Sequence, residues 1–302
     1  MFNIVYGIFY LFSLLPIQIL YLFGDAIYGL IYYVFGYRKK VVMQNLLIAF
    51  PEKSEEERKK IAKRFYHNFV DTFIETIKLI SASRAWIKKR FIADPSVFHY
   101  LHEKGKRCQI HLGHNFNWEI ANDGLPLYVD YPFIVVYMPL KNKIFDRLFM
   151  KLRSRTGTIM LPATDMKNAL LPFREKLYIL TLVADQVPGD VTNAYWLNFF
   201  NKPTPFLRGP ERGARIGNIP VVFAHITKWK RGHYEVHFKL EDEEPRKLTE
   251  GELTRRYIKF LEEVIRNSPD MWLWSHRRWK KEWKPEYSKL WIDVLPPPAS
   301  GA

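Results

Sequence analysis

The first 23 residues, Met1 to Phe23, carry no charged side chain. A helix rises about 1.5 Å per residue, so about 20 apolar residues in a row can cross the hydrocarbon core of a bilayer. A second apolar run follows Asp25 and ends at the basic cluster Arg38-Lys39-Lys40. Because basic flanking residues favour the cytoplasmic side, we expect residues 1–37 to be a membrane anchor and the remaining chain to face the cytoplasm. A spanning helix, a helix in the membrane surface and a buried core helix all remain open.

The composition indicates a folded protein with an anionic partner. The chain has 302 residues, of which 48% are apolar, 46 are Lys or Arg and 31 are Asp or Glu, so its net charge is +15. A single cysteine, Cys108, excludes a disulfide scaffold and a cysteine-rich metal site. An aromatic content of 16% together with this charge suits either nucleic acid or the membrane interface. The N-terminal segment favours the membrane, and we expect no nucleic acid partner.

The pattern after the anchor predicts an α/β fold. Ser54 and Glu57 form a capping-box pattern ahead of a long amphipathic helix that extends to about residue 80. Beyond residue 107, short apolar runs alternate with helical patterns. We therefore expect a mixed, mostly parallel central sheet flanked by helices, forming one α/β domain over 38–290. We expect the proline-rich residues 291–302 to be a loose tail. The predicted strands are 108–112, 132–137, 177–184, 219–226 and 234–240, the last two antiparallel, and the predicted helices are 141–156, 165–175, 209–217 and 249–267.

The densest group of polar residues follows the first of these strands and runs from His111 to Glu119. If His114 lies in the turn before a helix and Glu119 in its first turns, the carboxylate can hold one imidazole nitrogen and leave the other as a base. No serine or cysteine nucleophile lies in this run, so such a base would activate a substrate hydroxyl directly. The alternative is a capping histidine and a solvated acid. His111 and His114 have a His-x-x-His spacing, but a third ligand is not evident, and we expect no metal.

Three further segments carry candidate binding residues. Asp185 and Gln186 follow the buried strand 177–184, where Asp185 either contacts a substrate or caps the turn at Pro188-Gly189. The segment from Arg208 and Gly209 to Arg212 enters a helix, and it is either an anion site or a solvated basic face. The Trp- and Arg-rich segment 272–281 suits a membrane interface, a bound phosphate or single-stranded nucleic acid.

Taken in order, these segments resemble the lipid A late acyltransferases, within the wider His-x4-Asp/Glu glycerolipid acyltransferase superfamily. The resemblance covers about residues 1–285 and rests on 37–46, Phe50-Pro51-Glu52, His114 to Glu119, Asp185-Gln186, 209–222 and 272–280. It implies that His114 is the general base and Glu119 its orienting partner. It implies that the reaction uses neither a metal nor a cofactor. It also implies a substrate-binding role for a set of surrounding residues: Asn117, Trp118, Arg155, Asp185, Gln186, Arg208, Gly209 and Arg212.

The same resemblance implies the substrates and the location. The donor would be acyl carrier protein or acyl-CoA, and the acceptor a phosphorylated disaccharide lipid in the inner membrane, with the catalytic domain in the cytoplasm. A basic surface would attract the acidic carrier protein, the phosphorylated acceptor and the anionic membrane alike. Many relatives have Arg-Pro where this chain has Met138-Pro139, so another hydroxylated acceptor, such as an amino-acid lipid, stays open. Two other functions also stay open: a hydrolase, and a membrane-tethered anionic-ligand-binding protein without catalysis.

Overall fold

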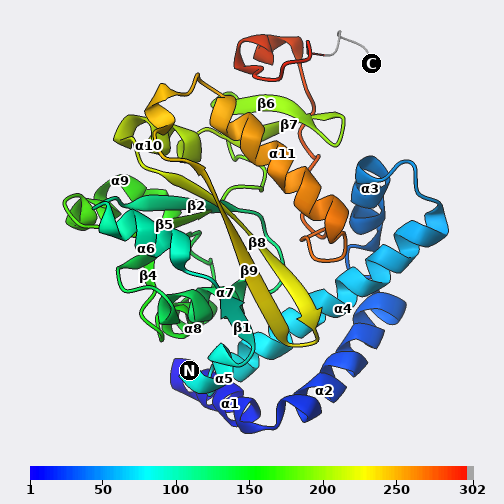
Figure 1. Ribbon diagram of the computed structural model, residues 1–302. Helices are drawn as coiled ribbons and strands as arrows, with labels where there is room; N and C mark the ends of the chain where they lie inside the picture. Colours follow the sequence, from blue (N-terminus) through cyan, green and yellow to red (C-terminus); the bar gives the residue numbers. More distant parts are fainter. Residues whose placement is uncertain (298–302) are drawn as a thin grey trace.

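The computed structural model describes residues 1–297 and places a twisted sheet at the centre of the molecule (Figure 1). The N-terminal third is helical: α1 (Phe2–Leu14), α2 (Ile17–Gly29), a π-helix (Leu30–Phe35), α3 (Lys39–Ala49), α4 (Glu55–Leu79) and α5 (Arg84–Lys88). The strands are β1 (Phe91–Ala93), β2 (Cys108–Leu112), β3 (Phe133–Tyr137), β4 (Ile159–Pro162), β5 (Ile179–Val183), β6 (Ala194–Phe199), β7 (Lys202–Leu207), β8 (Val221–Lys230) and β9 (His233–Asp242). The later helices are α6 (Ser96–Glu103), α7 (Trp118–Gly124), α8 (Lys143–Arg153), α9 (Met166–Ala169), α10 (Gly209–Gly217) and α11 (Glu252–Asn267).

Seven strands form the main sheet in the order β1-β9-β8-β2-β5-β3-β4. Every pair in it is parallel except β8 and β9, which form the antiparallel hairpin expected around Arg231-Gly232. The predicted fold class, a mixed and mostly parallel sheet flanked by helices, is therefore confirmed. β6 and β7 form a separate two-stranded hairpin.

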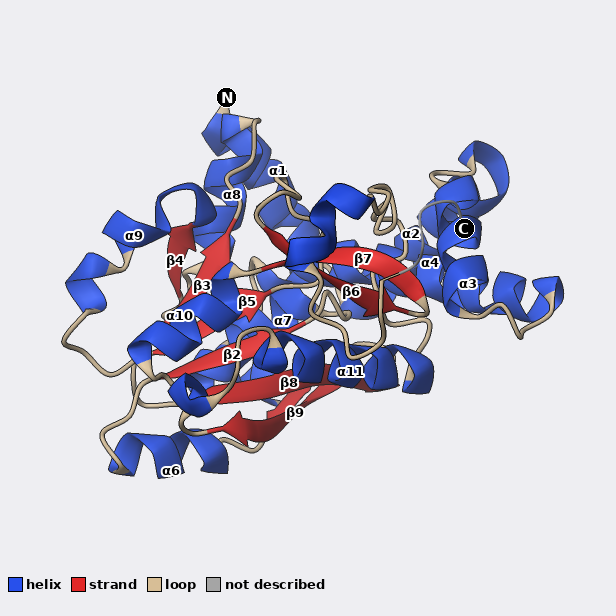
Figure 2. Cartoon of the chain, turned by 90° about the horizontal axis from the view of Figure 1, so that it is seen from above, coloured by secondary structure: helices blue, strands red, loops and turns tan. Residues whose placement is uncertain are grey.

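β2 is buried along its whole length because helices cover both faces of the sheet (Figure 2). On one face, His111 packs against the rings of Phe223 and Tyr257, and Tyr257 belongs to α11. On the other face, Phe98 of α6 packs against Phe238 of β9. A parallel strand buried on both faces tends to be apolar; β2 keeps this at Cys108, Ile110 and Leu112, while Gln109 and His111 are buried polar residues.

The long helix α4 begins as expected. The side chain of Ser54 accepts from the backbone N–H of Glu57, and the Glu57 carboxylate accepts from the backbone N–H of Ser54 at 2.7 Å, so the capping box is complete. The helix runs for 25 residues and contacts α1, α2, α3 and α7. It thereby connects the N-terminal helices to the sheet domain.

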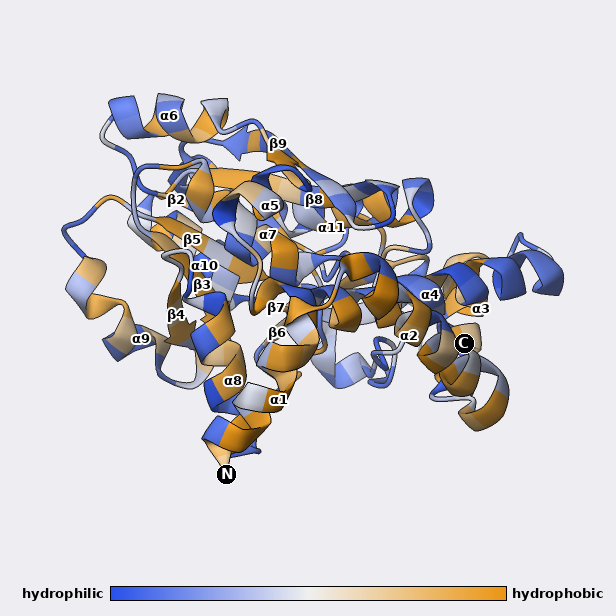
Figure 3. Cartoon of the chain, turned by 90° about the horizontal axis from the view of Figure 1, so that it is seen from below, coloured by the Kyte–Doolittle hydropathy of each residue, from blue (hydrophilic) through white to orange (hydrophobic). Residues whose placement is uncertain are grey.

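The N-terminal helices lie against the domain with an apolar outer surface. α1 has 13 residues and ends before Pro16. From α2, Ile17 and Leu20 pack onto Val70 and Ile74 of α4. The segment Ile17–Phe35 has 19 residues and is apolar enough to cross a membrane by length and composition. Figure 3 shows α1 and α2 mostly orange. Many large apolar side chains on them and on the following π-helix are exposed, among them Ile4, Leu11, Leu22, Phe23, Tyr33, Val34 and Phe35.

The structure differs from the predicted elements in several places. The helical pattern 165–175 forms only α9 and short 3-10 turns, and β1, β4 and the β6–β7 hairpin were not predicted. β7 has prolines at 203 and 205, which argue against a strand. The strand tolerates these prolines because β7 pairs only with β6, so one of its edges needs no N–H donors. The Pro205 carbonyl accepts from Arg278 and so lies on that unpaired edge.

The expected tail is bonded to the domain over its first residues. The backbone N–H of Ile292 donates to Trp196 O at 2.9 Å, and Asp293 accepts from the Asn198 side chain at 2.9 Å. Residues 298–302, the end of that predicted tail, lie outside the described residues.

The packing between α7 and β1 gives a test of the fold. A Cβ atom on Gly124 would overlap the ring of Phe91, which is fully buried. We expect Gly124→Ala to destabilise the protein by about 1–3 kcal/mol, because a closely packed core cannot absorb the extra methyl group. Gly209 is also helical but has open space around its Cα, so Gly209→Ala is the matched control and should change stability little. Urea unfolding in detergent measures both, and equal effects would contradict the packing.

Candidate active site

The candidate site lies where two neighbouring parallel strands end. β2 and β5 pair in parallel, with Leu112 opposite Val183. His114 follows β2 by two residues and Asp185 follows β5 by two residues. Parallel pairing therefore brings both side chains to the same edge of the sheet, which is the edge where α/β proteins bind ligands.

Asp185 holds His114 through both side chain and backbone. His114 Nδ1 lies 2.5 Å from Asp185 Oδ1, and the backbone N–H of His114 donates to Oδ2 at 2.8 Å. The indole N–H of Trp272 also donates to Oδ2, at 2.6 Å. Burial by itself raises the pKa of the Asp185 carboxyl, but the charge of His114 and these hydrogen bonds lower it to about 2. Asp185 is therefore an ionised acceptor that keeps a proton on Nδ1 and leaves Nε2 as the basic nitrogen.

The basic nitrogen of His114 faces Gln186. Gln186 Nε2 lies 3.2 Å from His114 Nε2, and the Trp118 ring meets the imidazole edge-on with centroids 5.6 Å apart. The His114 side chain is 22% exposed and that of Asp185 only 2%. The imidazole is thus partly exposed while the carboxylate behind it is buried, an arrangement that suits a general base with an orienting acid.

Glu119, the expected partner of His114, lies elsewhere. Its carboxylate accepts from Arg153 Nε at 2.9 Å and from the Trp118 indole N–H at 3.1 Å. Glu119 is in the first turn of α7, one residue beyond Trp118, so its side chain points to the end of α8 and not back to the turn at His114. The imidazole of His114 is bonded instead to the carboxylate of Asp185, which follows His114 by 71 residues in the chain.

The other predicted binding residues do not all contact His114 or Asp185. Arg155 donates to the Ala82 carbonyl and faces Asp123 at 3.7 Å. Arg208 pairs with Glu250 at 2.5 Å and lies over the Tyr195 ring. Within residues 1–297, no hydrogen bond or ion pair joins these two arginines to His114. Gly209 and Arg212 are in the first turns of α10, whose Pro210 shares a small cavity with Ala184 next to Asp185.

Two residues of β2 with potentially reactive side chains, His111 and Cys108, are buried in the core. His111 faces α11, bonds Gln109 at 2.9 Å, and burial lowers its pKa to about 3. Burial raises the pKa of the Cys108 thiol to about 12. His111 is therefore a neutral core histidine and Cys108 an inert thiol. In the described part of the chain, no cluster of three His, Cys, Asp or Glu residues could hold a metal ion.

Comparison with known proteins gives the family of the chain. The family described as bacterial lipid A biosynthesis acyltransferase matches residues 1–281. The chain belongs to this family. It is 25% identical over 280 residues to the lipid A biosynthesis lauroyltransferase of Escherichia coli strain K12, covering 91% of this chain and 89% of the relative. It is 21% identical over 286 residues to the lipid A biosynthesis palmitoleoyltransferase of the same strain and to a lipid A biosynthesis acyltransferase of Shigella flexneri, with the same coverage. The protein is thus an acyltransferase.

A buried carboxylate supports, from behind, the loop 113–117 that carries His114; this loop is called the catalytic loop after the role proposed for His114 below. Asn117 caps α7 by accepting from the N–H groups of Glu119 and Ile120. Its Nδ2 donates to Glu75 of α4 at 2.8 Å, and Glu75 also accepts from the hydroxyls of Tyr21 and Tyr234 at 2.8 Å each. Burial and the nearby Asp71 raise the pKa of Glu75. Three donors from three elements therefore converge on one carboxyl group.

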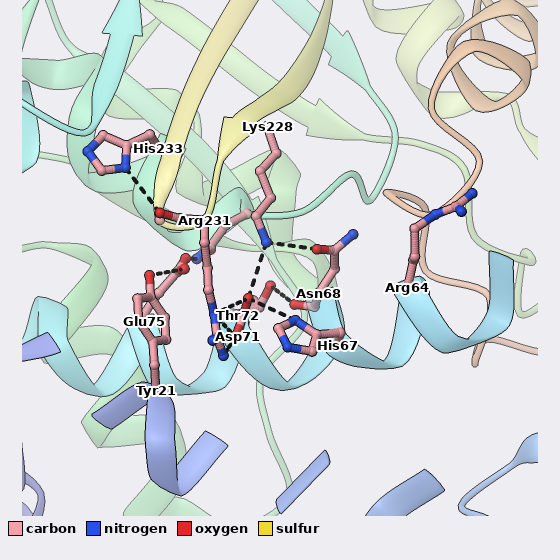
Figure 4. A network of polar contacts seen from close by, with 12 residues as sticks. Tyr21, Arg64, His67, Asn68, Asp71, Thr72, Glu75, Lys228, Arg231 and His233 are labelled. Carbon is pink, nitrogen blue, oxygen red and sulfur yellow. Dashed lines mark hydrogen bonds and ion pairs between the residues drawn. The ribbon is translucent and has the colours of Figure 1, made fainter. Parts of the chain in front are cut away.

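The same face of α4 carries a second buried acid, Asp71, shown in Figure 4. Asp71 pairs with Lys228 at 3.1 Å and with Arg231 at 2.7 Å, both from the β8–β9 hairpin. Arg231 also pairs with Asp25 of α2 at 2.6 Å. A continuous set of polar contacts thus joins α2, α4, the hairpin and the catalytic loop.

Three residues of this network have a signal in the sequence. Asn68, Asp71 and Glu75 recur three and four residues apart, on the buried face of α4 that also holds apolar residues such as Phe65 and Leu79. Charged side chains on a buried helical stripe need partners, so this pattern predicts a buried network, although not which residues complete it. No local pattern marks Arg153 as the partner of Glu119.

We expect Glu75→Ala to destabilise the protein by about 3 kcal/mol and to lower kcat more than it raises KM. The substitution leaves Asn117 Nδ2 and Tyr234 Oη without an acceptor, and an unsatisfied buried group costs about 1–3 kcal/mol. Glu75→Gln keeps an acceptor oxygen and should retain most of both properties. Glu56→Ala, on the exposed side of the same helix, is the control. Equal effects of the Ala and Gln variants on kcat would contradict this role.

Asp123 gives a pH test. Burial and the charge of Glu119 raise its pKa from 3.8 to about 7, against the effect of Arg155. Between these values the folded protein keeps a proton that the unfolded chain releases, so the stability contributed by this group falls as the pH rises. We expect Asp123→Asn to gain stability relative to wild type between pH 5 and pH 8, on the order of 2 kcal/mol. Denaturant unfolding at both pH values, with the exposed Asp130→Asn as control, measures this; a constant difference would contradict it.

Proposed function

We propose that this protein is a membrane-bound O-acyltransferase that moves a fatty acyl chain from an acyl thioester to a hydroxyl group of a lipid A precursor. His114 is the general base, and Asp185 orients it. The observation that carries the proposal is the 2.5 Å contact between His114 Nδ1 and the buried Asp185, in an imidazole that remains 22% exposed. Family membership supplies the reaction class.

The chemistry follows from that pair. His114 Nε2 takes the proton of the acceptor hydroxyl as its oxygen attacks the carbonyl carbon of the thioester. The tetrahedral intermediate collapses, the C–S bond breaks, and the proton on Nε2 passes to the departing thiolate. Asp185 stabilises the imidazolium between these steps. The reaction needs no protein nucleophile, which agrees with the inert, buried Cys108.

Gln186 occupies the place that the acceptor needs. Its amide N–H donates to His114 Nε2 in the resting site. The incoming hydroxyl must displace that amide, which then has a free N–H next to the reacting atoms. In our proposal this N–H stabilises the oxyanion that forms on the thioester carbonyl.

Glu119 is, in this proposal, a positioning residue and not the direct partner of the base. Arg153 fixes its carboxylate, and the carboxylate accepts from Trp118, whose ring packs edge-on against His114. Glu119 thus limits the rotation of the imidazole through Trp118. Asn117 contributes by capping the helix that carries both residues.

We also propose that α1 and α2 lie along the surface of the inner membrane, with the active site on the cytoplasmic side. Crossing the bilayer would separate Ile17 and Leu20 from α4 and break the ion pair between Asp25 and Arg231. Burying an unpaired carboxylate in hydrocarbon is costly. The outward apolar side chains of α1 and α2 then enter the interfacial layer, as in other monotopic anchors. The donor in this proposal is acyl carrier protein or acyl-CoA; both are anionic, so a net charge of +15 attracts either one.

A mass-resolved transfer assay tests the proposal. Detergent-solubilised protein receives acyl carrier protein or CoA loaded with mixed chain lengths, together with a phosphorylated disaccharide lipid precursor of lipid A or a total lipid extract. We expect one acyl mass to be added to the precursor by the wild type. His114→Ala and Asp185→Asn should lower kcat by about 10³-fold or more, since Asp185→Asn offers an N–H where Asp185 now accepts.

The control variant is His99→Ala, which removes an exposed histidine. It should retain the wild-type rate. Full activity of His114→Ala would exclude the base assignment. Thioester consumption without acylated lipid would favour a hydrolase, acylation of another lipid in the extract would change the acceptor, and no turnover with either donor would favour a binding protein.

A further inference from the structure

The tip of the β8–β9 hairpin carries a continuous stack of aromatic and cationic side chains. The guanidinium of Arg90 lies over the Trp86 ring, 4.4 Å from its centre, and Arg90 Nη1 lies 3.5 Å from both ring nitrogens of His233. The His233 ring is in turn 4.8 Å from the Trp229 ring, measured between centres. Together with two flanking lysines, these side chains are called the tip patch: Trp86, Lys89, Arg90, Trp229, Lys230 and His233.

The cations of the tip patch lie close together. Lys89 and Lys230 are exposed, and their ammonium groups form no hydrogen bond or ion pair within residues 1–297. Arg90 donates to the Gly232 carbonyl at 3.3 Å. Burial and the charges of Arg90, Lys230 and Lys89 lower the pKa of His233, against the effect of its hydrogen bond to a backbone carbonyl. Like charges in such proximity repel one another, and an anion bound among them removes that cost.

The acidic residues around the hairpin have other partners. Asp25 and Asp71 both pair with Arg231, at 2.6 and 2.7 Å. Glu235, on the same face of β9 as His233, lies 4.0 Å from His237. The tip patch is therefore available to an anion from outside the chain.

The tip patch borders the anchor helix α2. Trp86 packs against the apolar cluster that contains Ile17 and Leu20. The hairpin turn itself lies against α2, because a Cβ atom on Gly232 would overlap the hydroxyl of Tyr21. Figure 1 shows α5 and the hairpin tip on the same lower side of the sheet domain as α1 and α2, and Figure 4 shows His233 at the hairpin turn.

The exposed apolar side chains at this border favour a lipid surface over a soluble acidic partner. Trp229 is 56% exposed, and Leu22 and Phe23 on α2 are 69% and 51% exposed. Indole rings and cations beside an apolar face are typical of the membrane–water interface, where the rings enter the interfacial layer and the cations meet anionic head groups.

We propose that the tip patch binds the anionic head groups of a phospholipid bilayer and is a second membrane contact beside α1 and α2. The inference rests on the proposed function in one respect, which is the position of α1 and α2 on the membrane surface. Lys89, Arg90 and Lys230 attract the phosphate groups, and the Trp229 indole enters the interfacial layer. Helices that lie in an interface can roll about their own axes, and a contact to one side of them removes that freedom. The tip patch thus fixes how the sheet edge with His114 faces the membrane.

Vesicle flotation at low and high salt tests the inference. Wild type and Lys89→Gln/Lys230→Gln are mixed with phosphatidylcholine vesicles that either contain or lack phosphatidylglycerol. We expect the double variant to raise the Kd for phosphatidylglycerol vesicles about tenfold or more at low salt, because each cation near an anionic surface adds to binding. Binding to pure phosphatidylcholine should not change. High salt should remove the difference, because it screens the charges.

Two further variants make the test specific to this surface. Trp229→Ala should raise the Kd for both kinds of vesicle about fivefold, because it removes the indole from the interface. Lys167→Gln/Lys259→Gln removes the same charge from exposed positions on α9 and α11, and it is the matched control that should leave the Kd near the wild-type value. Urea unfolding checks that every variant is folded.

The outcomes separate this inference from the proposed function. An equal loss in the control would assign the effect to net charge, and an unchanged Kd in either the lysine or the tryptophan variant would remove that part of the contact. Weaker binding of the lysine variant to pure phosphatidylcholine would mean that the lysines dock the anchor. A rise in KM for the acyl donor with unchanged vesicle binding would assign the patch to the donor. Each of these results overturns the inference, whereas salt-dependent binding that needs Lys89 and Lys230 stands even if no acyl transfer is detected.

Discussion

The hydrogen bond between His114 and Asp185 depends on the parallel pairing of β2 and β5, and the proposed chemistry depends on that bond. Each residue lies two positions beyond its strand. A parallel neighbour is the arrangement that brings two such positions, far apart in sequence, to one edge. Burial makes the carboxylate a stronger electrostatic partner for the imidazole than it would be in water. The backbone N–H of His114 and the Trp272 indole satisfy its other oxygen.

Helix α4 stabilises this edge from the outside. Its buried acids are satisfied only when α2, the β8–β9 hairpin and the catalytic loop are all in place. Because an unpaired buried acid is costly, the anchor and the active site are thermodynamically linked. The N-terminal helices therefore share a buried polar network with the sheet domain, and the boundary near residue 37 stays a prediction.

The surface has two kinds of positive charge. Some cations are neutralised within the fold, as Arg153 is by Glu119 and Arg231 by Asp71 and Asp25. Others, such as Lys40 and Arg277, are exposed and form no ion pair within residues 1–297. The net charge of +15 does not separate these classes. Only the second class can meet an anionic substrate or membrane, so the function of the charge is local.

The sequence by itself determined the fold class, the capped helix α4, the buried strands β2 and β5, and His114 as a candidate base, because these follow from local periodicity and local capping. It also determined that Asp185 and Gln186 end a buried strand. Only the tertiary structure decided that Asp185 and not Glu119 contacts His114, that Glu75 supports Asn117, and that β7 tolerates two prolines. The physical reason is that a partner across a sheet or a helix interface is chosen by three-dimensional pairing and burial, and sequence spacing limits only the contacts within one turn or one helix.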